Sequence, residues 1–361
     1  MSRLRSAGLV GGLLGLAATG AAVGLVGERY AVGRVRLKPD PDAGEAFFAL
    51  PADRVRRVVA DDGVPLHVEE VGRPDAPLTV VLSHGYTQQL AVWHYQRKAL
   101  ASPDVRLVLW DQRSHGRSGR SAPERETIDQ LGRDLLAVLD ATAPRGPVVL
   151  VGHSMGGMTI MALADQRPAL FGPRVVAVAL VSTSSGLLSE VTFGLPAALS
   201  PVSRRVLPLL TKGVRSRPAV FERGRRLGTD LAFLVARRMA FGSRDVSPAL
   251  VEFVEKMTAE CDVDVIAEFY DTFSSHDKLA ALDVLRGVET LVLVGSRDLV
   301  TPETHSRAMA EALPDAELVV VDGAGHMVQL ERPDVVTEQL GDLVRRAHLP
   351  GADRQRTSGR A

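Results

Sequence analysis

The chain has 361 residues, 45% of them hydrophobic, which is enough for one large domain or for one domain with an inserted lobe. Lysine plus arginine and aspartate plus glutamate each number 43, so the net charge is zero and no overall field favours nucleic acid as a partner. The single cysteine, Cys261, excludes an intramolecular disulfide and any metal cluster built from several cysteines.

The amino terminus carries an uncharged apolar segment at residues 7–27, directly after a basic tip at residues 1–6. About 20 apolar residues in a helix span a bilayer, so we expect a membrane anchor and a membrane-associated protein. The Gly- and Ala-rich composition also fits a cleaved signal segment of a secreted protein, or a helix buried in the fold. The orientation stays open because basic residues lie on both flanks: Arg3 and Arg5 before the segment, and Arg29, Arg34, Arg36 and Lys38 after it.

The rest of the chain divides into a linker, a large domain and a tail. Residues 28–53 contain three prolines and mixed charges, which predicts a linker. From residue 54 to residue 348 strand and helix patterns alternate, which predicts the large domain. We expect residues 349–361 to form a disordered tail.

The strands of this domain begin with two short segments around Asp61-Asp62-Gly63, a predicted hairpin turn. The later strands are almost purely hydrophobic, as parallel strands covered by helices on both faces require. They are predicted at residues 78–83, 105–110, 147–151, 175–182, 290–294 and 317–321.

Amphipathic helices separate these strands. Residues 127–142 place four apolar side chains on one helical stripe behind a capping box formed by Thr127 and Gln130. The stripe consists of Ile128, Leu131, Leu135 and Leu139, and a similar stripe of Val336, Leu340 and Leu343 follows Pro333. The alternation predicts an α/β fold with a doubly wound, mostly parallel sheet.

Residues 186–280 contain no strong strand, only helical stretches such as DLAFLVARRMAF and PALVEFVEKM. The interval is too long for a loop. We expect a helical cap inserted after the sixth strand, over the carboxyl edge of the sheet, where ligands bind in open α/β folds. An ordinary row of surface helices would also fit the pattern.

A nucleophile elbow follows the strand VVLV. Gly152-His153-Ser154-Met155-Gly156 has the G-x-S-x-G spacing in the strand-turn-helix context that the motif requires. The glycines leave room for a strained turn in which the serine has a positive φ angle. This pattern predicts Ser154 as a nucleophile.

A serine hydroxyl needs a base, and the base needs an orienting acid. After a G-x-S-x-G elbow the expected chain order is serine, acid and then histidine after the last strand. LVLVGSRD places Asp298 after a buried strand, and LVVVDGAGH places His326 after the final one. We predict Asp298 and His326 as the acid and the base. The competitors are Asp322 for the acid, and His84, His115 and His153 for the base.

An oxyanion hole needs N–H donors that are fixed in advance. Met155, the residue after the nucleophile, is expected to supply one backbone N–H. The loop Ser83-His84-Gly85-Tyr86 is expected to supply the other, from Tyr86, unless its ring only lines the entrance.

Taken together, these motifs resemble the α/β-hydrolase superfamily over roughly residues 54–348. The resemblance rests on His84-Gly85-Tyr86, on DQRSHGRS at residues 111–118, on Gly152 to Gly157, on Asp298 and on Gly325-His326. It implies a cofactor-independent hydrolase with a triad and an oxyanion hole, often with a cap after the sixth strand, and a structural role for the DQRSHGRS loop. Epoxide hydrolases and haloalkane dehalogenases in this family use an aspartate nucleophile, so Ser154 argues against both activities.

The predicted triad and oxyanion hole indicate hydrolysis of a carboxylic ester, or of a thioester or amide, through an acyl-enzyme. We expect a small-molecule ester with an apolar acyl group, because the predicted cap carries Phe193, Leu195, Phe233 and Phe241. The sequence contains no recognised motif for nucleotide, zinc or calcium, so no cofactor or metal is expected. Three rival functions are a cofactor-free haloperoxidase or perhydrolase, a small-molecule receptor on a hydrolase fold, and a membrane-bound interaction protein.

Overall fold

The computed structural model describes residues 39–188 and 237–348, together with the single residues 33, 37, 191 and 234. The predicted apolar segment at residues 7–27, the tail at 349–361 and nearly all of residues 189–236 of the predicted cap lie outside the described residues. Within the part that is described, no helix combines the length and the apolar character needed to cross a bilayer.

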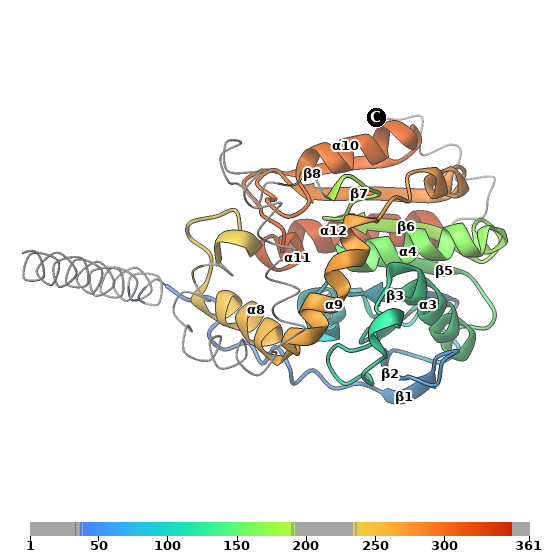
Figure 1. Ribbon diagram of the computed structural model, residues 1–361, viewed down its shortest axis with the longest axis horizontal. Coiled ribbons are helices and arrows are strands. Elements are labelled where there is room, and N and C mark those ends of the chain that lie inside the picture. The colour runs from blue at the N-terminus through green and yellow to red at the C-terminus, as the bar shows by residue number, and fades with distance from the viewer. Residues whose placement is uncertain are drawn as a thin grey trace, which may run out of the picture.

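The described residues form an eight-stranded sheet in the order β1-β2-β4-β3-β5-β6-β7-β8 (Figure 1). β2 runs antiparallel to both of its neighbours, and the other pairs are parallel. The strands are β1 (Arg54–Val59), β2 (Pro65–Val71), β3 (Leu78–Ser83), β4 (Val105–Trp110), β5 (Val148–His153), β6 (Val175–Val181), β7 (Glu289–Gly295) and β8 (Glu317–Val321). The predicted α/β architecture is therefore confirmed.

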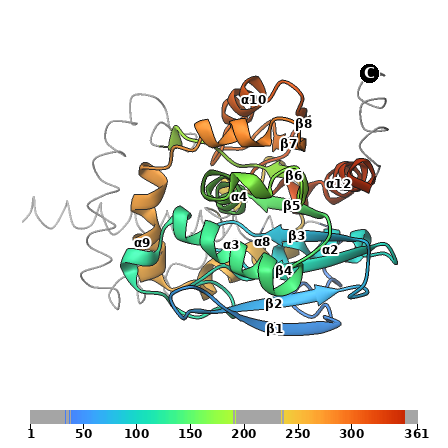
Figure 2. The same ribbon diagram turned by 90° about the vertical axis from the view of Figure 1, so that its right-hand side faces the viewer.

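Helices cover both faces of the sheet (Figure 2). One face packs against α2 (His94–Leu100), α11 (Val328–Glu331) and α12 (Pro333–His348). The other packs against α3 (Ile128–Thr142), α4 (Met155–Gln166) and α10 (Glu303–Ala312). Every residue of β3, β4, β5 and β6 is buried, which explains why these strands are continuous apolar runs in the sequence.

Two local details differ from the prediction. β5 extends past residue 151 through Gly152 and His153, so the strand leads directly into the elbow. The capping box of α3 is only half formed. Thr127 Oγ1 accepts the Gln130 N–H at 3.1 Å, but the Gln130 amide group instead donates to Asp61 at 2.7 Å and to Asp134 at 3.2 Å. Gln130 thereby joins α3 to the turn of the first hairpin.

The parallel strands end at a common edge of the sheet. In the pairing register Ser83 lies opposite Gly152, His153 opposite Val181, and Gly295 opposite Val321. The loops that follow these strands therefore emerge beside one another. They carry Tyr86, Ser154, Asp298 and His326.

The cap lies between β6 and β7, as predicted. Its described helices are α8 (Pro248–Glu260) and α9 (Val263–Ser274), which lie together at one end of the sheet (Figure 1). The Tyr86 hydroxyl donates to the carbonyl of Ile266 on α9, and Gln89 donates to Glu260 on α8 at 2.8 Å. These contacts place both helices over the loop that follows β3.

Residues 39–51, here named the strap, lie within the predicted linker but pack on the domain. Asp40 accepts a 3.1 Å hydrogen bond from an N–H in the first turn of α8, and Phe47 stacks on Phe253 of the same helix with ring centroids 4.4 Å apart. On the body side, Glu45 pairs with Lys98 of α2 at 2.9 Å. The strap therefore touches the cap and the body before the chain enters β1.

Candidate active site

Ser154 occupies the turn between β5 and α4 with φ +52° and ψ −118°. A positive φ is rare for a residue with a side chain, and it costs on the order of 1–3 kcal/mol unless the surroundings impose it. The neighbouring glycines make the turn feasible. A Cβ on Gly156 would lie 2.2 Å from the carbonyl oxygen of Ser83, and a Cβ on Gly152 would lie 2.4 Å from that of Gly156. Larger residues at either position would clash with backbone.

Hydrogen bonds hold both peptide groups of Ser154. Its N–H donates to the carbonyl of Val181 at 2.9 Å, and its carbonyl accepts the Thr183 hydroxyl at 2.7 Å. Ser154 as a whole is 6% exposed. The strained conformation is therefore imposed by β6 and by the loop that follows it.

His326 and Asp298 lie against each other at the same edge. His326 Nδ1 is 2.9 Å from Asp298 Oδ2 and 3.1 Å from Oδ1. The Thr301 hydroxyl donates to Oδ2 at 2.9 Å, and the N–H groups of Val300 and Thr301 donate to Oδ1 at 2.8 and 2.9 Å. This set of donors fixes the carboxylate in one orientation.

The electrostatics of Asp298 favour the ionised form. Burial opposes ionisation, but the His326 ring and the donors from Thr301 and Val300 outweigh it, and the pKa of Asp298 is lowered. A carboxylate that faces Nδ1 places the ring proton on that nitrogen. His326 Nε2 is then left with a lone pair, as a general base requires.

The peptide between Gly85 and Tyr86 has a fixed direction. The Gly85 carbonyl accepts from His84 Nδ1 at 2.7 Å and from the Gln88 N–H at 3.3 Å. No cis peptide occurs among the described residues, so the Tyr86 N–H points opposite to that carbonyl. Met155 opens α4, and N–H groups in a first helical turn have no partner within the helix.

The three competing histidines are buried and held neutral. Burial lowers the pKa of His84 to about 3, of His115 to about 4 and of His153 to about 3. Both ring nitrogens of His84 are in hydrogen bonds, Nδ1 with the Gly85 carbonyl and Nε2 with the Gln112 N–H at 2.9 Å. None of these three rings faces a carboxylate of the described chain as His326 does.

Asp322, the competitor for the acid, and Phe241, expected in the cap, lie in other surroundings. Asp322 is 3.3 Å from the Ser296 hydroxyl in an exposed contact, whereas His326 pairs with Asp298. Phe241 is buried in the main core together with α8 and α12. Phe193, Leu195 and Phe233 lie outside the described residues.

The sequence did not single out Thr183, Thr301 or Gln88, although each contacts a predicted site residue or the loop Ser83-His84-Gly85-Tyr86, here named the oxyanion loop after its predicted role. Thr301 follows Asp298 by three residues, a spacing typical of turns in which an aspartate accepts hydrogen bonds from the residues after it. Thr183 has no comparable local pattern, since Ser154 lies 29 residues earlier in the chain. Gln88 contacts Gly85 three residues before it, but its other partner, Met327, lies 239 residues later.

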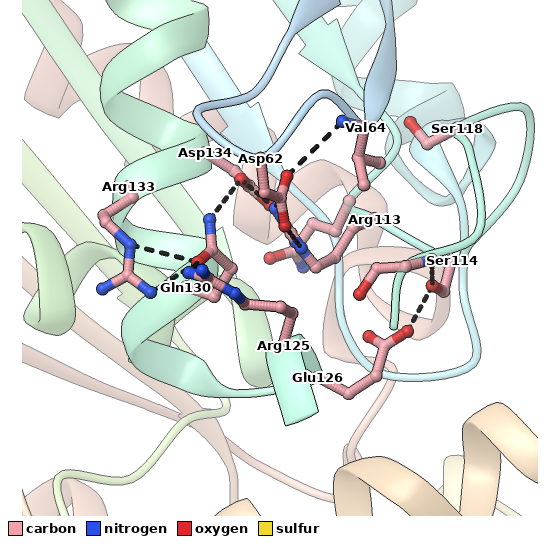
Figure 3. Close-up of polar contacts among 12 residues, drawn as sticks. Asp62, Val64, Arg113, Ser114, Ser118, Arg125, Glu126, Gln130, Arg133 and Asp134 are labelled. Carbon is pink, nitrogen blue, oxygen red and sulfur yellow. Dashed lines mark hydrogen bonds and ion pairs between the residues drawn. The ribbon is translucent and has the colours of Figure 1, made fainter. Parts of the chain in front are cut away.

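The DQRSHGRS loop is built around buried charge (Figure 3). Arg113 is fully buried and forms a two-pronged ion pair with Asp134 at 2.6 and 2.7 Å, while its other Nη atom donates to Asp62 at 2.7 Å. Gln112 donates from its backbone N–H to His84 Nε2, and its side chain accepts the Thr159 hydroxyl at 2.7 Å. The DQRSHGRS loop thus supports the oxyanion loop through its contact with His84, in line with the structural role that the resemblance implies.

Within the described ranges, no three His, Cys, Asp or Glu side chains are grouped so that they could hold a metal ion. The chemistry available at this edge is a serine on a strained turn, a histidine–carboxylate pair and backbone N–H donors.

The family described as alpha/beta hydrolase fold matches residues 79–333. The chain belongs to this family. Epoxide hydrolase A from Mycobacterium tuberculosis is 29% identical over 335 residues, which cover 79% of this chain and 95% of that protein.

Two solved structures of the α/β-hydrolase fold illustrate the likeness. An enol-lactonase from Burkholderia xenovorans has a TM-score of 0.62 with 26% identity, over 80% of this chain and all of the other. A thermophilic esterase from Thermogutta terrifontis has a TM-score of 0.63 over 82% of this chain and all of the other, and at 23% identity it shows the fold alone. The family and its relatives indicate that the chain is a hydrolase.

Proposed function

We propose that this α/β hydrolase cleaves carboxylic esters through an acyl-enzyme, with Ser154 as nucleophile, His326 as general base and Asp298 as the acid that orients the base. The observation that supports it most directly is the His326–Asp298 pair at the sheet edge where the strained Ser154 turn begins. The elbow and the base loop touch, because His153 Nε2 lies 2.9 Å from the carbonyl oxygen of His326.

In the proposed reaction Ser154 Oγ attacks the ester carbonyl carbon and His326 Nε2 takes the hydroxyl proton. The N–H groups of Met155 and Tyr86 stabilise the negative oxygen that forms. His326 returns the proton to the leaving alcohol as the ester bond breaks, which leaves an acyl group on Ser154. Water then attacks the acyl carbon while His326 takes one of its protons. His326 returns that proton to Ser154 Oγ as the carboxylic acid leaves.

The cap supports an apolar acyl group as the substrate preference. A satellite core cluster joins Val265 and Phe269 of α9 to Met155 and Met158 of α4, with Tyr86 packed against it. Met155 follows the nucleophile directly, so this apolar cluster begins next to the reacting carbon. An apolar chain placed there would bury its surface against side chains of the same kind.

The likeness to an epoxide hydrolase does not change this proposal. The family resemblance implies an aspartate nucleophile for that reaction. This chain has Ser154 at the elbow. A serine with a histidine base favours acyl transfer.

We also propose that residues 7–27 attach the enzyme to a membrane. The support is the uncharged apolar composition of that segment alone. Fractionation of cells that express the full chain tests it: recovery in the membrane pellet after a carbonate wash is expected, and recovery in the supernatant would contradict it.

The activity is tested with p-nitrophenyl esters of two to sixteen carbons and the purified full-length protein. We expect turnover, with a preference for medium or long chains, and at least a 10³-fold loss in Ser154→Ala. Ser306→Ala is the matched control, because this buried hydroxyl has no hydrogen-bond partner among the described residues. Turnover that persists in Ser154→Ala would contradict the assignment of the nucleophile.

A further inference from the structure

Two buried polar side chains in contact with each other lie between the three loops of the proposed site, and neither has a part in the reaction described above. The two side chains are Gln88, after the oxyanion loop, and His153, immediately before the nucleophile. Gln88 is 7% exposed and His153 is fully buried. Buried polar groups are retained where their hydrogen bonds hold a specific geometry.

Gln88 holds the oxyanion loop. Its Oε1 accepts the Gly85 N–H at 3.0 Å, and its own backbone N–H donates to the Gly85 carbonyl at 3.3 Å. The side-chain Nε2 lies 3.3 Å from the sulfur of Met327, the residue after the proposed base. Gln88 therefore bonds to both the N–H and the carbonyl of Gly85, and that carbonyl sets the direction of the Tyr86 N–H.

His153 holds the base loop. Its Nε2 lies 2.9 Å from the carbonyl oxygen of His326. A carbonyl only accepts, so Nε2 carries the proton and donates. The other nitrogen, Nδ1, therefore carries no proton. It lies 3.1 Å from Gln88 Oε1, which already accepts the Gly85 N–H, so the two side chains are in contact without a hydrogen bond between them. A Cβ on Gly85 would fall 2.9 Å from the same Nδ1, so the loop fits closely around this ring.

We propose that His153 and Gln88 are positioning residues that set the distance between the base and the oxyanion hole. This inference rests on the proposed function. The catalytic groups belong to loops after β3, β5 and β8, which are far apart in the sequence, and the two side chains connect all three through atoms that touch no substrate. A shift of about 1 Å in such groups lowers a rate by about 100-fold.

A neutral ring at position 153 also suits the base. The two ring centroids, of His153 and His326, are 4.8 Å apart. His326 becomes a cation when it takes the serine proton, and a second cation at that distance would oppose it. Burial keeps the pKa of His153 at about 3, so His153 stays uncharged when His326 takes the serine proton.

Three variants separate positioning from simple packing. His153→Phe keeps an aromatic ring but removes the N–H that donates to the His326 carbonyl. His153→Gln keeps a donor that reaches the position of Nε2. Gln88→Leu removes the side-chain oxygen that accepts the Gly85 N–H. His94→Phe is the control: His94 is also buried, and the change keeps an aromatic ring but removes one hydrogen bond, to Glu45 of the strap at 2.7 Å. Thermal unfolding monitors the fold of each.

The readout is the rate at which a fluorophosphonate probe modifies Ser154, together with kcat per titrated site and KM on an ester. We expect His153→Phe and Gln88→Leu to lower the modification rate and kcat by about 10- to 100-fold with KM within about twofold. His153→Gln should recover most of the loss, and His94→Phe should lower only the unfolding temperature. If His153→Phe does not fold, the comparison of Gln88→Leu with the parent decides.

Two results would overturn the inference, and they are distinct. Modification of Ser154 at the parental rate in His153→Phe or Gln88→Leu would show that these residues only fill space, while the proposed function would stand. Failure of the probe to modify Ser154 in the unaltered enzyme would remove the proposed nucleophile, and the positioning role with it.

Discussion

The body and the cap are held in place by different kinds of contact. In the body, backbone groups position the proposed site: the Ser154 N–H bonds to β6, and the Val300 N–H, in the loop after β7, bonds to the Asp298 carboxylate. The cap rests on the body largely through side chains, such as Gln89 with Glu260 and Arg120 with Glu268 and Asp264. Several of these side chains are partly exposed.

From this difference we expect changes in the body and changes in the cap to alter different kinetic constants. Backbone contacts between buried strands are not altered by single side-chain changes, so the geometry of the proposed site depends little on the side chains of the cap. Partly exposed side-chain pairs contribute little each, so we expect substitutions in these pairs to leave the fold intact. We expect body variants to lower kcat and cap variants to change KM.

The largest effect should come from Asp298→Asn. The amide no longer holds the protonated His326 Nδ1, and the base is presented in the wrong tautomer, so kcat should fall by about 10³- to 10⁴-fold. Steady-state assays with an ester measure it. Asp322→Asn is the matched control and should stay within about twofold. A loss of less than tenfold in Asp298→Asn would remove Asp298 from the proposed triad.

Arg113→Met tests the structural side of the body. The change leaves the buried carboxylate of Asp134 without its partner, and we expect a loss of about 3–5 kcal/mol in the free energy of unfolding. Urea denaturation measures it. In the control, Arg54→Met, Glu70 keeps Arg56 and Arg106 as partners, and the loss should stay below about 1 kcal/mol. Equal losses in both variants would contradict a special role for Arg113.

The buried histidines predict a pH dependence of stability. His84, His115 and His153 have folded pKa values of about 3 to 4, whereas an unfolded histidine has a pKa of about 6.5. Between these values the unfolded chain binds more protons, so stability falls as the pH falls. The slope is about 1.4 kcal/mol per pH unit for each histidine.

Urea unfolding at intervals from pH 7 to pH 5 checks this slope. His115→Phe should reduce the slope of the unfolding free energy against pH by the contribution of one histidine, because Phe does not titrate in either state. A slope that is the same in the parent and in His115→Phe would show that His115 is protonated in the folded enzyme.

The smallest effect is expected in the cap. Arg120 is 34% exposed and bridges Glu126 of the body to Glu268 of α9. Arg120→Met should lower the free energy of unfolding by less than about 1 kcal/mol. It should raise KM a few-fold with kcat unchanged, and added salt should reduce the difference in KM between parent and variant. Arg307→Met removes an exposed pair with Glu303 on α10 and should change neither constant. A fall in kcat in Arg120→Met would contradict the separation of rate from affinity.

The placement of the proposed site residues at one edge of the sheet could be predicted because each follows a buried strand, and the strands are visible as apolar runs. Ser154, Asp298 and His326 needed only the motif and the chain order. Gln88 and His153 could not be assigned a joint role, since 65 residues separate them and no local pattern reports the contact. The strap was also missed as a packed segment, because its prolines and mixed charges resemble those of a free linker and its partners on α8 lie about 200 positions later.

The strap has a mechanical consequence. Residues before it include the apolar segment proposed to enter a membrane, and the first contact of the described chain with the domain after that segment is Asp40 on the end of α8. A displacement of the amino-terminal chain therefore reaches the cap before it reaches the sheet. A fragment cut at the first strand would lose the stacking of Phe47 on Phe253 and the hydrogen bonds of Asp40 at the end of α8.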